Sequence, residues 1–234
     1  MLLKCDLAEV LILMNESNEQ STSQTLGTSL LKVIGRSDLP DLATDIGELG
    51  IDELLENGLL KDVPFLGGIL KLAKFGISVS NYLFLEKISK FLSNLKDIPV
   101  EQRARFIQEL EQDEEFRQRV GENLLLLLHR LDDVDKPELL GRAFRAYVEG
   151  RIEYPTYQKL ATAIDRIKIY NIDGLKKFYD ESPDREPPDD ETLQDLAFCG
   201  LVSLNVVKGL TFGPMEGFEK NEIGKVFMKI VLED

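Results

Sequence analysis

The chain has little of the residue chemistry that catalytic and metal sites usually need. Its 234 residues include one histidine, His129, and two cysteines, Cys5 and Cys199, which lie far apart. The cysteines form neither a CxxC pair nor a zinc-like spacing, and His129 has no nucleophile or acid at a recognisable spacing. Phosphate-loop, dinucleotide-binding, nucleophile-elbow and zinc-peptidase motifs are also missing from the sequence. We therefore expect no enzymatic activity, no cofactor and no metal site, and a structural role for His129.

Signals for export and for membrane crossing are missing as well. The first residues include the acids Asp6 and Glu9 and lack a basic n-region, and no stretch reaches 18 residues without a charge. Two widely separated cysteines fit a reducing compartment. These features predict a cytoplasmic protein.

Positive charge is scarce. The chain has 28 Lys and Arg against 42 Asp and Glu, so its net charge is −14, whereas 43% hydrophobic residues are ordinary for a globular protein. Such a charge repels phosphates, which argues against a nucleic acid partner. The triplet Asp132, Asp133 and Asp135 resembles the start of a calcium loop, but the sixth position from Asp133 is Glu138 instead of glycine. We interpret it as a helix-capping turn.

The hydrophobic pattern predicts a mainly α protein. Residues 1–37 form an N-terminal segment, and its polar part, residues 15–29, has no apolar period and is expected to be flexible. A helical bundle is predicted over 38–180, with helices near 38–58, 65–95, 100–110, 113–131, 137–150 and 154–169. The run of leucines in 113–131 predicts the central helix, apolar almost all round. Gly150 is predicted as the left-handed residue after its helix.

The last part of the chain changes character after a Pro-rich and acidic linker at 180–188. A helix is predicted over 189–199, followed by β-like runs at 203–207 and 210–212. A turn-rich tip at 213–217 and a final helix at 221–232 complete a small α+β module over 189–234.

Two sequence patterns make this module resemble the later part of a winged-helix domain. They are Leu196-x-x-Cys199-Gly200-Leu201-Val202 and Phe218-x-Lys220-Asn221-x-x-Gly224. The resemblance implies a helix, a two-stranded wing and a short helix, with a candidate wing formed by Met215, Glu216 and Phe218. From Asp165 to Asp234 there are nine Lys and Arg against 15 Asp and Glu, a net charge of −6. A wing that reads DNA needs a basic tip, so we favour protein binding over DNA binding.

The middle of the chain is similar to a family of uncharacterised bacterial helical proteins from phage-related and mobile gene neighbourhoods. The similarity rests on Pro64-Phe65-Leu66-Gly67, His129-Arg130-Leu131-Asp132 and the stretch from Leu140 to Tyr147. Residues 140–152 also resemble a helical hairpin of TerB-like domains, although the metal-binding acids of that class have no counterparts here. The family implies no activity.

Residues 63–92 are the most distinctive candidate site. This apolar segment carries four lysines and one acid, Glu86, so its charge is +3 in a chain of −14. Polar residues at steps of three and four suggest an amphipathic helix that meets a membrane or a partner. The alternative is a core helix whose lysines pair with acids elsewhere. The candidate surface consists of Lys71, Lys74, Ser78, Asn81, Lys87 and Lys90.

Three functional hypotheses follow. The first is a non-enzymatic protein-interaction or regulatory protein, which binds a protein partner or itself, in a bacterial conflict system such as phage defence or in a mobile element. The second is an effector that acts on membranes through 63–92. The third is a DNA-binding regulator.

Overall fold

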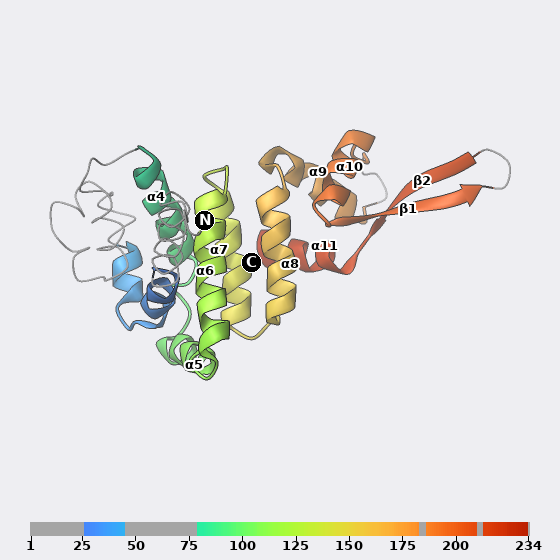
Figure 1. Cartoon of the computed structure of the whole chain (residues 1–234). Helices are drawn as coiled ribbons and strands as arrows, with labels where there is room; N and C mark the ends of the chain where they lie inside the picture. The colour runs from blue at the N-terminus through green and yellow to red at the C-terminus, as the bar shows by residue number, and fades with distance from the viewer. Residues whose placement is uncertain (1–25, 45–78, 183–185, 210–212, 234) are drawn as a thin grey trace, which may run out of the picture. The chain divides into compact units, whose positions relative to one another are not determined.

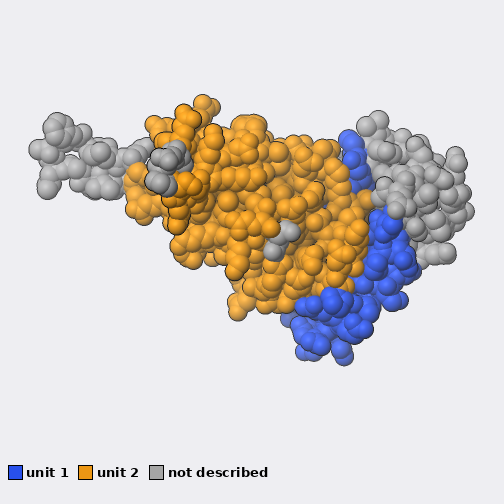
Figure 2. Space-filling model, turned by 180° about the vertical axis from the view of Figure 1, so that it is seen from behind, with its two compact units in different colours: residues 1–86, 99–129 blue, residues 87–98, 130–234 orange. Residues whose placement is uncertain are grey.

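The computed structural model describes residues 26–44, 79–182, 186–209 and 213–233 (Figure 1). These residues are mainly helical, with one antiparallel sheet of two strands near the C-terminus. The predicted fold class, a helical bundle followed by a small α+β module, is confirmed at this level. The chain divides into two compact units: residues 1–86 and 99–129 form unit 1, and residues 87–98 and 130–234 form unit 2 (Figure 2). The predicted boundary between bundle and module, at 180–189, falls inside unit 2.

The described part of unit 1 consists of helical residues 26–35 and 39–44, the first half of α4 (Val79–Ser93), α5 (Val100–Leu110) and most of α6 (Glu114–Arg130). Pro99 precedes α5, which matches the helix predicted near 100–110. The buried side chains come from each of these segments and include Leu30, Leu31, Ile34, Leu39, Leu85, Phe106, Leu110, Val120, Leu124 and Leu128.

Two expectations for unit 1 were wrong. Residues 26–29 are helical, although the polar run 15–29 was expected to be flexible. A Cβ atom on Gly27 would lie 2.5 Å from the carbonyl carbon of Gly121, so two glycines let this helix approach α6 closely. The helix predicted to be central, α6, is also not buried on every side, because Leu126 is 54% exposed and the buried residues of α6 follow one face.

Unit 2 begins with the second half of α4 and continues with α7 (Lys136–Val148) and α8 (Tyr154–Arg166), which pack together. Their core is rich in aromatic rings: Phe144 contacts Phe91 and Tyr157, and Tyr157 stacks on Tyr147. Gly150 has φ 71°, which confirms its predicted role after α7.

The chain then makes a 3₁₀ turn, η2 (Ile169–Asn171), and a helix that the sequence did not predict, α9 (Ile172–Tyr179). It continues through α10 (Asp190–Phe198), where Asp189 caps the helix by accepting from Thr192 N at 2.8 Å. The strands β1 (Val202–Gly209) and β2 (Gly213–Lys220) form a hairpin, and α11 (Glu222–Phe227) runs into a π-helical turn, η3 (Met228–Leu232).

The predicted tip at 213–217 was wrong. These residues belong to β2 and pair with β1, Gly217 opposite Asn205 and Pro214 opposite Lys208. In a two-stranded sheet both strands are edges, and an edge strand tolerates glycine and proline because part of its backbone needs no partner in the ladder. The hairpin is therefore longer than the turn residues suggested.

Candidate binding surfaces of unit 2

Tyr179, at the end of α9, fixes the base of the hairpin. Its hydroxyl donates to the carbonyl of Leu201 at 2.7 Å and accepts from the backbone N–H of Asn221 at 3.0 Å. The Asn221 side chain accepts from Gly224 N at 2.8 Å and donates to the carbonyl of Gly200 at 3.1 Å, so it caps α11 and ties it to the turn before β1. Burial raises the pKa of Tyr179, which keeps the hydroxyl protonated as this donor.

The outward face of α10 carries carboxylates and one aromatic ring. Exposed positions fall at steps of three and four along one face of the helix, and Phe198 at its end is 74% exposed. The Arg166 guanidinium lies 5.6 Å from the centre of the Phe198 ring. We call this region the α10 surface; it consists of Asp190, Glu191, Gln194, Asp195 and Phe198.

Tyr170 extends the α10 surface toward η2. Its side chain is 76% exposed, and the neighbouring Asn171 is buried and donates to the Asp195 carboxylate at 2.9 Å, which joins η2 to α10. On the hairpin, Leu204 is 46% exposed and lies directly opposite Phe218. Three of the six large apolar side chains that are exposed in the described chain therefore lie between residues 170 and 204.

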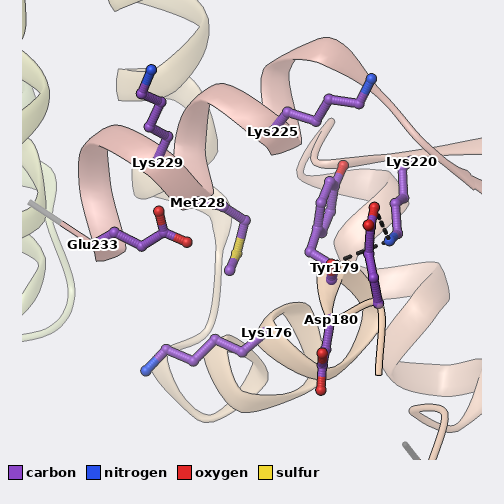
Figure 3. Close-up of a pocket in the computed structure, with 9 residues that line it drawn as sticks. Lys176, Tyr179, Asp180, Lys220, Lys225, Met228, Lys229 and Glu233 are labelled. Atoms are coloured by element: carbon purple, nitrogen blue, oxygen red, sulfur yellow. Dashed lines mark hydrogen bonds and ion pairs between the residues drawn. The ribbon is translucent and has the colours of Figure 1, made fainter. Parts of the chain in front are cut away.

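A pocket of about 550 Å³ lies between α9, the end of β2 and η3 (Figure 3). Lys220 donates to the carbonyl of Tyr179 at 3.1 Å, and Lys225 pairs with Glu222 at 2.7 Å. Figure 3 shows the amino groups of Lys225 and Lys229 pointing away from Met228 and Tyr179. The lysines do not converge on one place, and three acids share the lining. The full lining is Lys176, Tyr179, Asp180, Glu181, Lys220, Lys225, Met228, Lys229 and Glu233.

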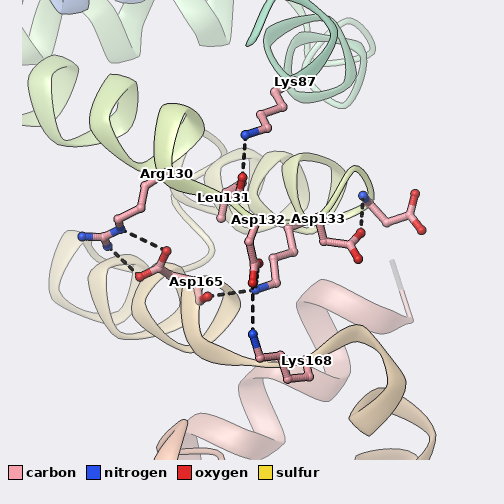
Figure 4. A network of polar contacts seen from close by, with 9 residues as sticks. Lys87, Arg130, Leu131, Asp132, Asp133, Asp165 and Lys168 are labelled. Atoms are coloured by element: carbon pink, nitrogen blue, oxygen red, sulfur yellow. Dashed lines mark hydrogen bonds and ion pairs between the residues drawn. The ribbon is translucent and has the colours of Figure 1, made fainter. Parts of the chain in front are cut away.

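The acidic turn after α6 is a structural network (Figure 4). Lys136, only 1% exposed, donates to the Asp132 carboxylate at 2.6 Å and to the carbonyl of Asp165 at 2.8 Å. Lys168 donates to the other oxygen of Asp132 at 3.1 Å. These two lysines, Lys136 first, hold the pKa of Asp132 at about 2. No group of acids, histidines and cysteines in the described residues could hold a metal ion.

Capping in this turn differs in detail from the prediction. Asp133, whose side chain accepts from the backbone N–H of Asp135 at 2.9 Å, stabilises the turn. Asp135 precedes α7 but makes no capping bond with its side chain. Cys199 is buried after α10, and burial raises the pKa of its thiol to about 11.

Part of the candidate surface at 63–92 lies outside the described residues: Lys71, Lys74 and Ser78, and the side chain of Asn81. The described lysines contact the turn after α6: Lys87 donates to the carbonyl of Leu131, and Lys90 donates to that of Val134 at 2.9 Å and lies 3.6 Å from Asp135. None of the helices within the described ranges has the length and apolar content to cross a membrane. A membrane role for 63–92 stays a prediction.

In the candidate wing, Met215 and Glu216 lie in β2, but their side chains are outside the described part. Phe218 is half-buried opposite Leu204. The sequence interpretation did not single out Tyr170 or Phe198. The spacing of residues could have identified Phe198 as exposed, because it follows Asp190 and Gln194 at steps of four and so shares their outward face.

Comparison with protein-family models, curated proteins and solved structures finds no match for this chain. The resemblances to the phage-related family, to TerB-like domains and to winged helices therefore stay predictions.

Proposed function

We propose that this chain is a non-enzymatic interaction or regulatory protein that binds a protein partner through the α10 surface. The observation that carries the proposal is Phe198, a large aromatic side chain exposed to 74% at the end of a helix whose outward face is otherwise polar. Large exposed apolar side chains grouped with polar ones are typical of interaction surfaces. The resemblance of the chain's middle to a phage-related family suggests a bacterial conflict system or mobile element as the setting.

The chemistry of the α10 surface indicates what kind of partner it takes. Aromatic residues dominate binding energy when a partner desolvates them, and Tyr170 and Phe198 are the two most exposed large apolar residues in the described chain. Asp190 and Glu191, in the first turn of α10, add negative charge to the same surface. A partner of complementary chemistry would present an apolar pocket rimmed by Lys and Arg.

The same face argues against DNA. A helix that approaches phosphates needs basic residues, and the outward face of α10 carries Asp190, Glu191 and Asp195 instead. The Arg166 guanidinium lies over the Phe198 ring. DNA binding through α10 would have to overcome charge repulsion along the whole helix.

The test is photo-crosslinking in cells that produce the protein, with a benzoylphenylalanine at position 198 and, in a second variant, at 170. We expect one discrete covalent adduct at both positions. A probe at Gln158, an exposed position of α8 in the same unit, is the matched control and should give none. The adduct is identified by mass spectrometry, and the partner is then purified.

Binding of the purified partner is measured by calorimetry. Phe198→Ala should weaken it at least about tenfold, as expected for a central aromatic residue. Asp190→Lys with Glu191→Lys should weaken it most at low salt, because salt screens exposed charges. The proposal fails if positions 158 and 198 crosslink alike, or if Phe198→Ala leaves the affinity unchanged.

A further inference from the structure

We propose that a second site of unit 2, a pocket lined by three arginines, binds the phosphate group of a phosphate monoester. The pocket has a volume of about 390 Å³ and is separate from the α10 surface. Its lining residues are Asn94, Arg142, Arg145, Glu149 and Arg151.

The fold brings two of these arginines to one carboxylate. Arg145 lies in the last turn of α7, and Glu149 follows directly after the helix. Gly150, with its positive φ, reverses the chain so that Arg151 returns toward the same place. Glu149 then accepts from Arg145 Nε at 2.9 Å through one oxygen and from Arg151 Nε at 2.7 Å through the other.

Within the lining, basic side chains outnumber acidic ones. The lining holds three guanidinium groups and one carboxylate. Arg142 also pairs with Glu138 at 2.6 Å and donates to the carbonyl of Val231 at 3.0 Å. Guanidinium groups held side by side repel one another, so an anion bound among them is favourable.

The geometry favours an oxyanion with several acceptor oxygens. Glu149 occupies the Nε atom of Arg145, and the Nη atoms of that arginine have no hydrogen-bond partner among the described residues. A guanidinium edge with two parallel N–H groups matches the spacing of phosphate oxygens. Arg145 is about one-third exposed, so the ligand can reach it from solvent.

The size of the pocket favours a monoester over free phosphate. A volume of about 390 Å³ is within the range of small-molecule sites and leaves room for a group attached to the phosphate. Glu149 and Asn94 add polar acceptors that could bond hydroxyl or amide groups on that attachment. A phosphorylated small molecule and a phosphorylated side chain share this chemistry.

The experiment is calorimetry on the full-length chain with inorganic phosphate, glycerol phosphate and a short phosphoserine peptide. Each titration is run at fixed ionic strength, with chloride as the reference anion. We expect glycerol phosphate or the phosphopeptide to bind at least several-fold more tightly than inorganic phosphate. The tighter of the two identifies the source of the phosphate group.

Variants locate the binding. Arg145→Gln and Arg151→Gln should each weaken binding about tenfold or more, and Arg145→Lys should weaken it less than Arg145→Gln. Arg119→Gln is the matched control: Arg119 is an exposed helical arginine paired with Glu115 in unit 1, and its loss should change nothing. Circular dichroism checks that each variant is folded. The proposal is overturned if none of the three ligands binds the unmodified chain, or if Arg145→Gln and Arg119→Gln bind them equally.

Discussion

Lys136 is one of the few charged side chains that are buried among the described residues, and its contacts explain how the interior accommodates its amino group. Its amino group has the Asp132 carboxylate at 2.6 Å and the carbonyl of Asp165 at 2.8 Å. A buried ammonium without such partners would lose more in desolvation than it gains. Lys168, whose side chain is exposed, pairs with the same carboxylate. Asp132, the first acid of the triplet that resembles the start of a calcium loop, therefore pairs with two lysines.

This network predicts a pH dependence of stability. The folded pKa of Asp132, about 2, lies below its ordinary value of 3.8. The ionised carboxylate therefore adds to stability above about pH 4, and this contribution is lost as the pH falls toward 2. Denaturant unfolding of the unmodified chain and Asp132→Asn, measured from pH 7 to pH 2, should show a stability difference that shrinks in that window.

The control is Asp133→Asn, which removes an acid of the same turn that bonds no lysine among the described residues. Its amide oxygen can still accept from Asp135 N. A difference for Asp132→Asn that stays constant down to pH 2 would show that the lysine pairs do not hold this carboxylate.

At the scale of elements, the sequence predicted the helices that carry their own start and stop signals. Pro99 before α5, Asp189 before α10, Asn221 before α11 and Gly150 after α7 all lie where the local chemistry indicated. These signals act over three or four residues, so the sequence alone reveals them.

The missed elements depend on distant partners. Helix 26–35 is paired with α6 through Gly27 and Gly121, and α9 contains Gly174, whose missing side chain makes room for Thr192. A glycine inside a helix weakens a sequence-based assignment unless the close approach it permits is known. The α10 surface and the arginine pocket also depend on contacts between residues that are distant in the sequence. Arg142 and Arg145 lie on one predicted helix, but only the fold brings Asn94 and Arg151 beside them.

One glycine contact gives a test at this scale. A Cβ atom on Gly224 would overlap the hydroxyl of Tyr179 and the carbonyl of Leu201, the two groups whose bond fixes the base of the hairpin. We expect Gly224→Ala to lower the free energy of unfolding by about 1–3 kcal/mol, as overpacking against backbone does. Gly217→Ala is the control, because its Cβ would lie 4.0 Å from the nearest atom, Asn205 O. Equal losses in denaturant unfolding would contradict this account of Gly224.

At the scale of the whole molecule, the chain passes between two compact units three times: within α4, just before α5 and at the end of α6. Each unit has its own buried residues and its own polar anchor. In unit 1 the anchor is Arg103, 1% exposed, which donates to the carbonyls of Ile34 at 3.0 Å and Arg36 at 2.9 Å and so closes the end of helix 26–35. Burial lowers the pKa of Arg103, and these carbonyls are acceptors that compensate for lost water.

Arg103→Ala therefore tests whether the units unfold separately. It leaves two carbonyls without their donor, which should cost roughly 2–4 kcal/mol. In hydrogen exchange followed by mass spectrometry, peptides from 26–44 and 100–128 should lose protection by that amount, while peptides from 136–179 keep theirs. Arg105→Ala, an exposed neighbour on α5, is the control and should alter neither set. If Arg103→Ala lowers protection equally in both units, they unfold as one cooperative body, and the division of the chain describes its contacts but not its stability.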